Sequence, residues 1–210
     1  MNLQKSNFGV TWKDGVRIDY VLVDIRSGEG AGMENREVSL MEVLEFRDRK
    51  AVVQKELGQC SPDGTVVSLG LNIPGPVKSD PLLQEAFLEG RKELEQMFLR
   101  YGGRVLLTKA LEETAGYAAV YLVVGIDSFL LKRAAVQIEE AHALGRLFDV
   151  DVLGEGREPL TRERIGAQRR TCLLCGKDAK ICARSRAHSV EELQKKVWEI
   201  LTQWKEGQEA

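Results

Sequence analysis

The sequence predicts an α+β (mixed α/β) fold, in which helices flank a mixed β-sheet within a single domain. Segments with apolar residues at alternate positions, typical of strands, interleave with segments whose apolar residues recur every three or four positions, typical of helices. With 210 residues, 43% of them hydrophobic, the chain can bury a substantial core. It contains no internal repeat, low-complexity segment or clear linker that would divide it.

The N-terminal residues are expected to stand apart from this domain. A strand is predicted at residues 16–25, and the glycine-rich residues 28–32 are typical of a flexible break. Met33 follows directly. We hypothesise that Met33 is the native start and that residues 1–32 are an upstream extension. The predicted division is therefore an N-terminal extension at 1–34 and a domain at 35–210.

A capping box formed by Ser39 and Glu42 predicts a first helix that ends near Leu57 and Gly58. Its buried stripe is expected to comprise Leu40, Val43, Leu44 and Ala51. Arg47 and Gln54 fall on the same stripe. Either both extend from the edge of the core into solvent, or both reach a substrate phosphate.

The next elements follow from alternation, turn residues and helix caps. Lys78 follows a stiff Pro/Gly turn, residues 74–76, which is consistent with a phosphate-facing loop or with a simple tight turn. The segment 135–140 fits both a strand and a helix. The predicted elements are a strand at 65–73, a helix from Asp80-Pro81 to Gly102, strands at 104–108 and 117–124 (the latter central), a helix from Asp127 to about 137, a short helix at 161–169 and a final helix capped by Ser189 and Glu192.

The alternation of residues 147–153 predicts a strand with a pair of acids on one face. Phe148, Val150 and Val152 would share one face, and Asp149 and Asp151 the other, about 7 Å apart. Two neighbouring carboxylates repel each other unless a cation lies between them, and oxygen ligands suit Mg²⁺. The alternative is a strand whose acids simply face water.

Composition and charge narrow the classes of function. The net charge of −2 indicates no overall basic excess for nucleic acid. No apolar run is long enough to span a bilayer, and the N-terminus lacks the pattern of a secretion signal, so we expect a cytoplasmic protein. Residues 161–188 are nonetheless strongly cationic and are expected to attract phosphate.

Three cysteines and a histidine lie within this cationic block. The spacing of Cys172, Cys175, Cys182 and His188 could close a tetrahedral Zn²⁺ site. A zinc finger usually has a second closely spaced pair, which this segment lacks. We therefore favour buried thiols in a short helical elbow, with structural zinc as the alternative.

Three strings of residues resemble the citrate lyase holo-[acyl-carrier-protein] synthase family, the apo-citrate lyase phosphoribosyl-dephospho-CoA transferases. They are residues 72–78 (NIPGPVK), residues 139–152 (Glu139-Glu140 and His142 leading into GRLFDVDV) and residues 170–189 (RTCLLC through CARSRAHS). The resemblance covers about residues 38–204. It implies a nucleotidyltransferase-like fold, although the Gly-Ser pair usual in that superfamily is here Gly145-Arg146.

The resemblance implies a transferase that attaches a phosphoribosyl-dephospho-CoA group to a serine of the apo acyl carrier (gamma) subunit of citrate lyase. The donor would be the triphosphate precursor, 2'-(5-triphosphoribosyl)-3'-dephospho-CoA, and pyrophosphate would be released. Asp149 and Asp151 would then hold Mg²⁺. Glu140 or His142 would accept the serine proton. The triphosphate would be bound by Arg47, Lys78, Arg146, Arg170, Arg184 and Arg186.

Two other classes of function remain open at this point. A zinc-containing nucleic-acid-binding module would use the Cys/His cluster and the arginines, but it would leave the aspartate pair unexplained. A metal-dependent phosphohydrolase would use the aspartates with water as the nucleophile.

Overall fold

The computed structural model of the chain describes residues 7–13, 16–22 and 36–209. The elements in chain order are β1 (Asn7–Lys13), β2 (Val16–Leu22), α1 (Leu40–Cys60), β3 (Thr65–Leu71), α2 (Pro81–Arg100), β4 (Arg104–Glu113), β5 (Gly116–Val124), α3 (Ser128–Ala141), β6 (Phe148–Leu153), the 3-10 turns η1 (Glu155–Arg157) and η2 (Glu163–Ile165), α4 (Ala179–Ser185) and α5 (Val190–Glu209).

Strands β3 to β6 form a four-stranded sheet in the order β4-β5-β3-β6. The α+β class is confirmed, but the expected mixture of strand directions is not found, because all three pairings in this sheet are antiparallel. Helix α3 joins β5 to β6, which run parallel to each other, yet β3 lies between them. In the same way β5 separates β3 from β4. This split βαββαβ arrangement is the topology of ferredoxin-like folds.

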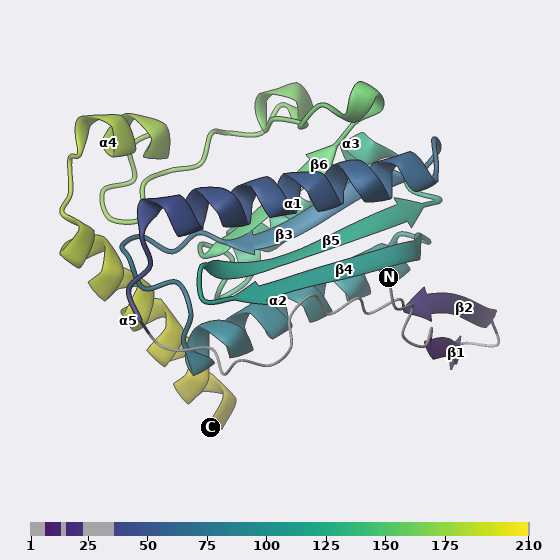
Figure 1. Cartoon of the computed structure of the whole chain (residues 1–210), viewed down its shortest axis with the longest axis horizontal. Coiled ribbons are helices and arrows are strands. Elements are labelled where there is room, and N and C mark those ends of the chain that lie inside the picture. Colours follow the sequence, from purple (N-terminus) through teal and green to yellow (C-terminus); the bar gives the residue numbers. More distant parts are fainter. Residues whose placement is uncertain (1–6, 14–15, 23–35, 210) are drawn as a thin grey trace.

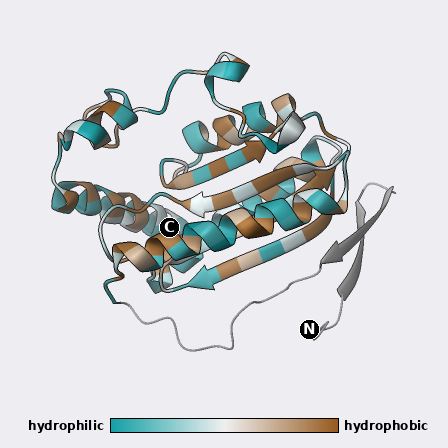
Figure 2. Ribbon diagram, turned by 45° about the horizontal axis from the view of Figure 1, so that its top comes forward, coloured by the Kyte–Doolittle hydropathy of each residue, from teal (hydrophilic) through white to brown (hydrophobic). Residues whose placement is uncertain are grey.

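Helices cover both faces of the sheet (Figure 1). Helix α1 lies over one face, where it packs on apolar residues of β3, β4 and β5. Helices α2, α3 and α5 pack on the other face, in the larger core cluster. Figure 2 shows hydrophobic residues along the strands and a mixture of hydrophobic and hydrophilic residues on the helices. In the described ranges, none of the helices has both the length and the apolar character needed to cross a bilayer.

The buried face of α1 differs from the predicted stripe. The capping box of Ser39 and Glu42 is confirmed. However, Leu40 and Leu44 are 74% and 43% exposed and Ala51 is exposed, whereas the buried apolar residues are Phe46, Val53 and Leu57. The stripe prediction was wrong because α1 covers a partly polar area of the sheet. Its inner face therefore carries polar side chains as well as apolar ones, which weakens the apolar periodicity.

The other elements mostly follow the sequence. The caps at Asp80 and Asp127 are confirmed, as is the second capping box at Ser189 and Glu192. The ambiguous segment 135–140 is helical, because α3 continues to Ala141. The predicted helix at 161–169 is only the single turn η2.

The N-terminal prediction is largely outside the described residues. Strand β2 agrees with the expected strand over residues 16–22 and pairs with β1 in a two-stranded antiparallel sheet. Residues 23–35, including Met33 and the glycine-rich run, lie outside the described ranges. The native start at Met33 and the division at residues 1–34 and 35–210 stay predictions.

Candidate functional site

The aspartate pair lies on the α1 side of edge strand β6. Phe148, Val150 and Val152 are buried in the opposite core, and Asp149 and Asp151 share the other face, which confirms the predicted orientation. The two acids lie opposite Gly70 and Ser68 of β3. Two small residues on the neighbouring strand leave room above the sheet for groups that approach the carboxylates.

Helix α1 places a lysine against this pair. Lys50 Nζ lies 2.9 Å from Asp151 Oδ2, and Gln54 donates a hydrogen bond of 2.8 Å to Ser68 Oγ. The sequence analysis did not single out Lys50. Lys50 follows Arg47 by three residues and precedes Gln54 by four, and residues with this spacing share one face of a helix. This spacing could have indicated that Lys50 lies beside them.

A small cleft of about 130 Å³ beside the pair is rich in cations. Arg47, Lys50, Lys78 and Asp149 line it together, so the structure brings both predicted phosphate ligands of the N-terminal half to the same aspartate. Lys78 donates a hydrogen bond to the carbonyl of Ile73. Burial lowers the pKa of Lys78, and the positive charge of Arg47 lowers it further. Cations that repel one another in this way favour the binding of an anion between them.

Asp149 itself sits in an unfavourable environment for a charge. Burial by the surrounding chain raises the pKa of the Asp149 carboxyl, and the negative charge of Asp151 adds to the effect, although 53% of the side chain still meets solvent. Lys50 and Arg170 oppose this shift only in part. A bound divalent cation would relieve the repulsion between the two acids.

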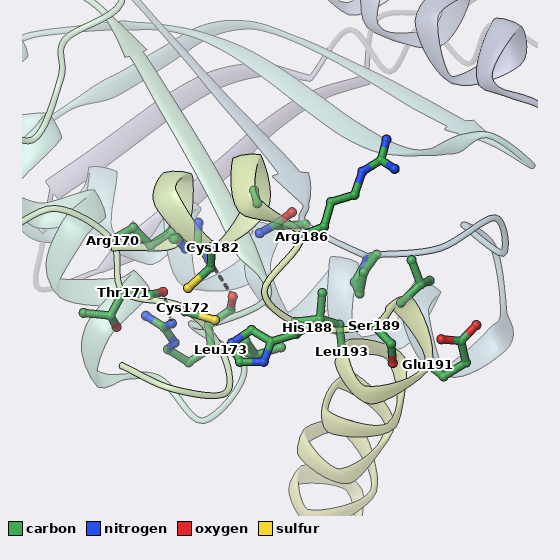
Figure 3. Close-up of a pocket in the computed structure, with 16 residues that line it drawn as sticks. Arg170, Thr171, Cys172, Leu173, Cys182, Arg186, His188, Ser189, Glu191 and Leu193 are labelled. Carbon is green, nitrogen blue, oxygen red and sulfur yellow. Dashed lines mark hydrogen bonds between the residues drawn. The ribbon is translucent and has the colours of Figure 1, made fainter. Parts of the chain in front are cut away.

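A larger cavity of about 720 Å³ adjoins the cleft and holds three of the predicted arginines, Arg146, Arg170 and Arg186 (Figure 3). Arg146 donates a hydrogen bond of 2.6 Å to the carbonyl of Thr171, and Arg170 donates one to the carbonyl of Arg146. Burial lowers the pKa of Arg146, followed by the charge of Arg170. The volume is in the range of cavities that hold nucleotide-sized ligands.

Arg170 connects the small cleft and the large cavity. Its guanidinium lies 3.7 Å from Asp149 Oδ1 and 4.0 Å from Glu139 Oε1. Asn72 lines both hollows. An elongated anion could therefore place its phosphates between Arg170 and the cations of the cleft while the rest of it occupies the cavity.

Two buried charged side chains of α3, to which the sequence analysis gave no role, hold the outer edge of β6. Glu139 Oε1 accepts the Val150 N–H at 2.9 Å, and Lys132 Nζ donates to the Val150 carbonyl at 2.7 Å. Glu139 also pairs with Arg162. These side chains satisfy backbone groups that a further strand would otherwise bind. Their separation of seven residues, on the face of α3 that meets β6, was the available signal.

Three other predicted residues are not brought to the aspartates. His142 Nδ1 accepts the Leu144 N–H at 3.0 Å, and its ring stacks on Phe148, which points away from the acid pair. Glu140 pairs with Arg162 at 2.7 Å. Arg184 is exposed on α4 and is not among the residues that line the large cavity.

The four residues of the alternative zinc site come together. The candidate ligand atoms of Cys172, Cys175, Cys182 and His188 all lie within 4.8 Å of one another. The Lys177 backbone N–H, followed by the side chains of His188 and Cys182, lowers the pKa of Cys175 to about 6. Cys175 in turn raises the pKa of Cys182 to about 11. One thiol of the cluster is thus stabilised as a thiolate, the form that binds metals.

Comparisons with known proteins point to one family. Residues 38–204 match the model of a family described as apo-citrate lyase phosphoribosyl-dephospho-CoA transferase. A probable enzyme of this name from Streptococcus pyogenes serotype M18 is 36% identical, with 78% of this chain and 85% of that protein covered. One from Vibrio cholerae serotype O1 is 37% identical over 64% of this chain and 76% of that protein. Protein CitXG of Leuconostoc mesenteroides is 35% identical, with 74% of this chain and 33% of that protein covered.

Proposed function

Because the chain belongs to the apo-citrate lyase phosphoribosyl-dephospho-CoA transferase family, it is a transferase that modifies apo-citrate lyase, and we propose that Asp149 and Asp151 lie at the centre of its active site. The matches give no support to a nucleic-acid-binding module or a phosphohydrolase. The observation that carries the proposed site is the meeting of four cations, from distant parts of the chain, around Asp149. They are Arg47, Lys50, Lys78 and Arg170.

The finer proposal concerns the substrates. The donor is 2'-(5-triphosphoribosyl)-3'-dephospho-CoA, and the acceptor is a serine of the acyl carrier (gamma) subunit. The serine oxygen forms a bond to the α-phosphorus, the bond from that phosphorus to the bridging oxygen breaks, and pyrophosphate leaves while the serine gives up its proton. Little covalent chemistry is asked of the protein, so positioning and charge neutralisation supply most of the catalysis.

The position of each cation suggests which part of the substrates it would bind. Arg47 and Lys78 would bind the phosphates from the small cleft, and Arg170 would hold them at the junction. Arg146 and Arg186 would bind along the large cavity, where the dephospho-CoA part has room. Exposed Arg184 is better placed to meet the carrier subunit.

Asp149 and Asp151 fit a Mg²⁺ ion, since both carboxylates lie on the same face of β6 and the pKa of Asp149 is raised. Such an ion would neutralise charge on the phosphates. Lys50 contacts Asp151 and would stabilise the pair before the ion binds. Neither Glu140 nor His142 lies against these acids, which argues against either as the proton acceptor.

The test is mass spectrometry of the apo carrier subunit after incubation with the protein, the precursor and Mg²⁺. The wild-type protein should add one phosphoribosyl-dephospho-CoA mass to the carrier and release one pyrophosphate. Asp149→Asn should lose at least about 100-fold in rate, in line with the loss of a charge-stabilising group in an active site. Asp48→Asn, at an exposed position of α1, is the matched control and should retain wild-type activity.

Two outcomes would overturn the proposed site or chemistry. Near-wild-type labelling by Asp149→Asn would remove the aspartates from the reaction. Pyrophosphate release that proceeds equally without the carrier would mean that water, and not serine, is the nucleophile.

A further inference from the structure

Residues 170–189 contain a metal-binding geometry that the transfer reaction does not require. Four candidate ligand atoms, three thiol sulfurs and one imidazole nitrogen, lie within 4.8 Å of one another. In a tetrahedral zinc site, with Zn–S bonds of about 2.3 Å, neighbouring sulfurs are about 3.8 Å apart. The observed spacing thus needs only small side-chain adjustments to enclose one ion.

The backbone of this segment is shaped around the cluster. The Cys172 N–H bonds to the Lys177 carbonyl, and Gly176 adopts a φ of 70°, so the chain between them forms a tight turn. An isolated bridge between Thr171 and Asp178 closes this turn. The turn carries two of the cysteines, and α4 carries the third.

The histidine supplies an independent observation. His188 Nε2 is buried and has no hydrogen-bond partner among the described residues. A buried polar atom without a partner destabilises the fold, so such atoms are rare unless a ligand or water satisfies them. Figure 3 shows the imidazole ring of His188 beside the sulfur atoms of Cys172 and Cys182.

Neither a disulfide nor a purely apolar role accounts for the thiol cluster as well as a metal does. Cys175 Sγ and Cys182 Sγ are 3.4 Å apart, beyond the bond length of about 2.05 Å in a disulfide. A purely apolar role would leave the imidazole nitrogen unsatisfied. Figure 1 shows α4 at the periphery, away from the sheet, so this segment has little core of its own to hold it in place.

We propose that Cys172, Cys175, Cys182 and His188 bind one structural Zn²⁺ ion. Four protein ligands close the coordination sphere, so the ion has a structural rather than a catalytic role. It would tie the turn, α4 and the start of α5 into one unit. Arg170 precedes the first ligand by two residues and Arg186 precedes the last by two, and both line the large cavity. The zinc would therefore fix the wall that presents these cations.

Metal analysis of the full-length protein tests the proposal without any assay of transfer. After purification from zinc-supplemented medium and dialysis, the protein should hold one zinc per chain. Replacement by Co²⁺ should give the visible absorption of tetrahedral thiolate coordination. Cys60→Ser is the matched control, because Cys60 is an exposed thiol of α1 outside the cluster, and this variant should keep its zinc.

Variants at the histidine separate coordination from packing. His188→Cys supplies another zinc ligand and should retain one zinc per chain, whereas His188→Ala should lose it. A strong chelator should lower the melting temperature of the wild-type and Cys60→Ser proteins but change that of His188→Ala little. A folded wild-type protein that holds well below one equivalent and gains no Co²⁺ absorption would overturn the proposal, as would full zinc retention by His188→Ala.

Discussion

The neighbours Glu139 and Glu140 contact the same arginine but should differ greatly in their contributions to stability. Glu139 is 4% exposed, accepts the Val150 N–H and pairs with Arg162. Glu140 is 55% exposed and, among the residues that the structure describes, pairs with Arg162 alone. The two replacements by alanine therefore remove one carboxylate each from the same ion-pair network at very different depths.

The structure gives the expected magnitudes. Removal of one partner from a buried ion pair costs about 3–5 kcal/mol, and an unsatisfied backbone N–H accounts for about 1–3 kcal/mol of this. Arg162 keeps Glu140 and Arg170 keeps Asp149 in the Glu139→Ala variant, so the lower limit of about 3 kcal/mol is expected. Glu140→Ala should cost about 0–1 kcal/mol.

Urea denaturation at neutral pH measures both variants. Thermal unfolding gives a second measurement. For a chain of this size, a loss of about 3 kcal/mol in the free energy of unfolding corresponds to a fall in melting temperature of about 6–12 °C. Glu139→Gln keeps an acceptor for the Val150 N–H and should lie between Glu139→Ala and the wild type. Two results would refute the proposed stabilisation of the edge of β6 by buried charges. One is a loss of unfolding free energy in Glu140→Ala as large as that in Glu139→Ala, and the other is a loss of less than about 1 kcal/mol in Glu139→Ala.

Three further outcomes follow from the site. The pKa of Asp149 is raised in the folded chain, so its charge opposes folding above that pKa. Without Mg²⁺, Asp149→Asn should therefore raise the melting temperature at neutral pH. If the variant still melts at a higher temperature than the wild type below about pH 3.9, where the wild-type carboxyl is protonated in both states, this reasoning is contradicted. Lys50 lowers the pKa of Asp149, so Lys50→Met should shift the acid limb of the transfer rate to higher pH, whereas an unchanged pH profile would argue against the contact. A Cβ at Gly145 would lie 2.4 Å from the Ile138 carbonyl oxygen, so Gly145→Ala should destabilise the fold by about 1–3 kcal/mol in urea titrations, whereas Gly207→Ala, with open space around it, should not.

The aspartate pair was predictable because strand geometry alone decides which side chains share a face. Alternation in residues 147–153 was sufficient to place Asp149 and Asp151 together, and the capping boxes marked the starts of α1 and α5 in the same way. The C-x2-C spacing likewise drew attention to the thiols. Each of these signals acts over a few residues, within which backbone geometry fixes the outcome.

The partners of the pair could not be found in this way. Lys50 lies 101 residues before Asp151, and only the packing of α1 across the sheet brings the two together. That packing also turned the helix so that Leu40 became exposed and Phe46 buried. Local periodicity could not reveal this rotation, because the sheet surface under α1 carries polar groups.

The sequence by itself determined the class of the fold, the face of β6 that bears the acids, the family strings and the cysteine spacing. Only the tertiary structure decided that β3 would separate β5 from β6 and that His142 would face away from Asp149. It also decided that Glu139 and Lys132 would hold the sheet edge. The physical reason is range: backbone periodicity acts between neighbours, whereas ion pairs and cavities form between segments that meet only when the core packs.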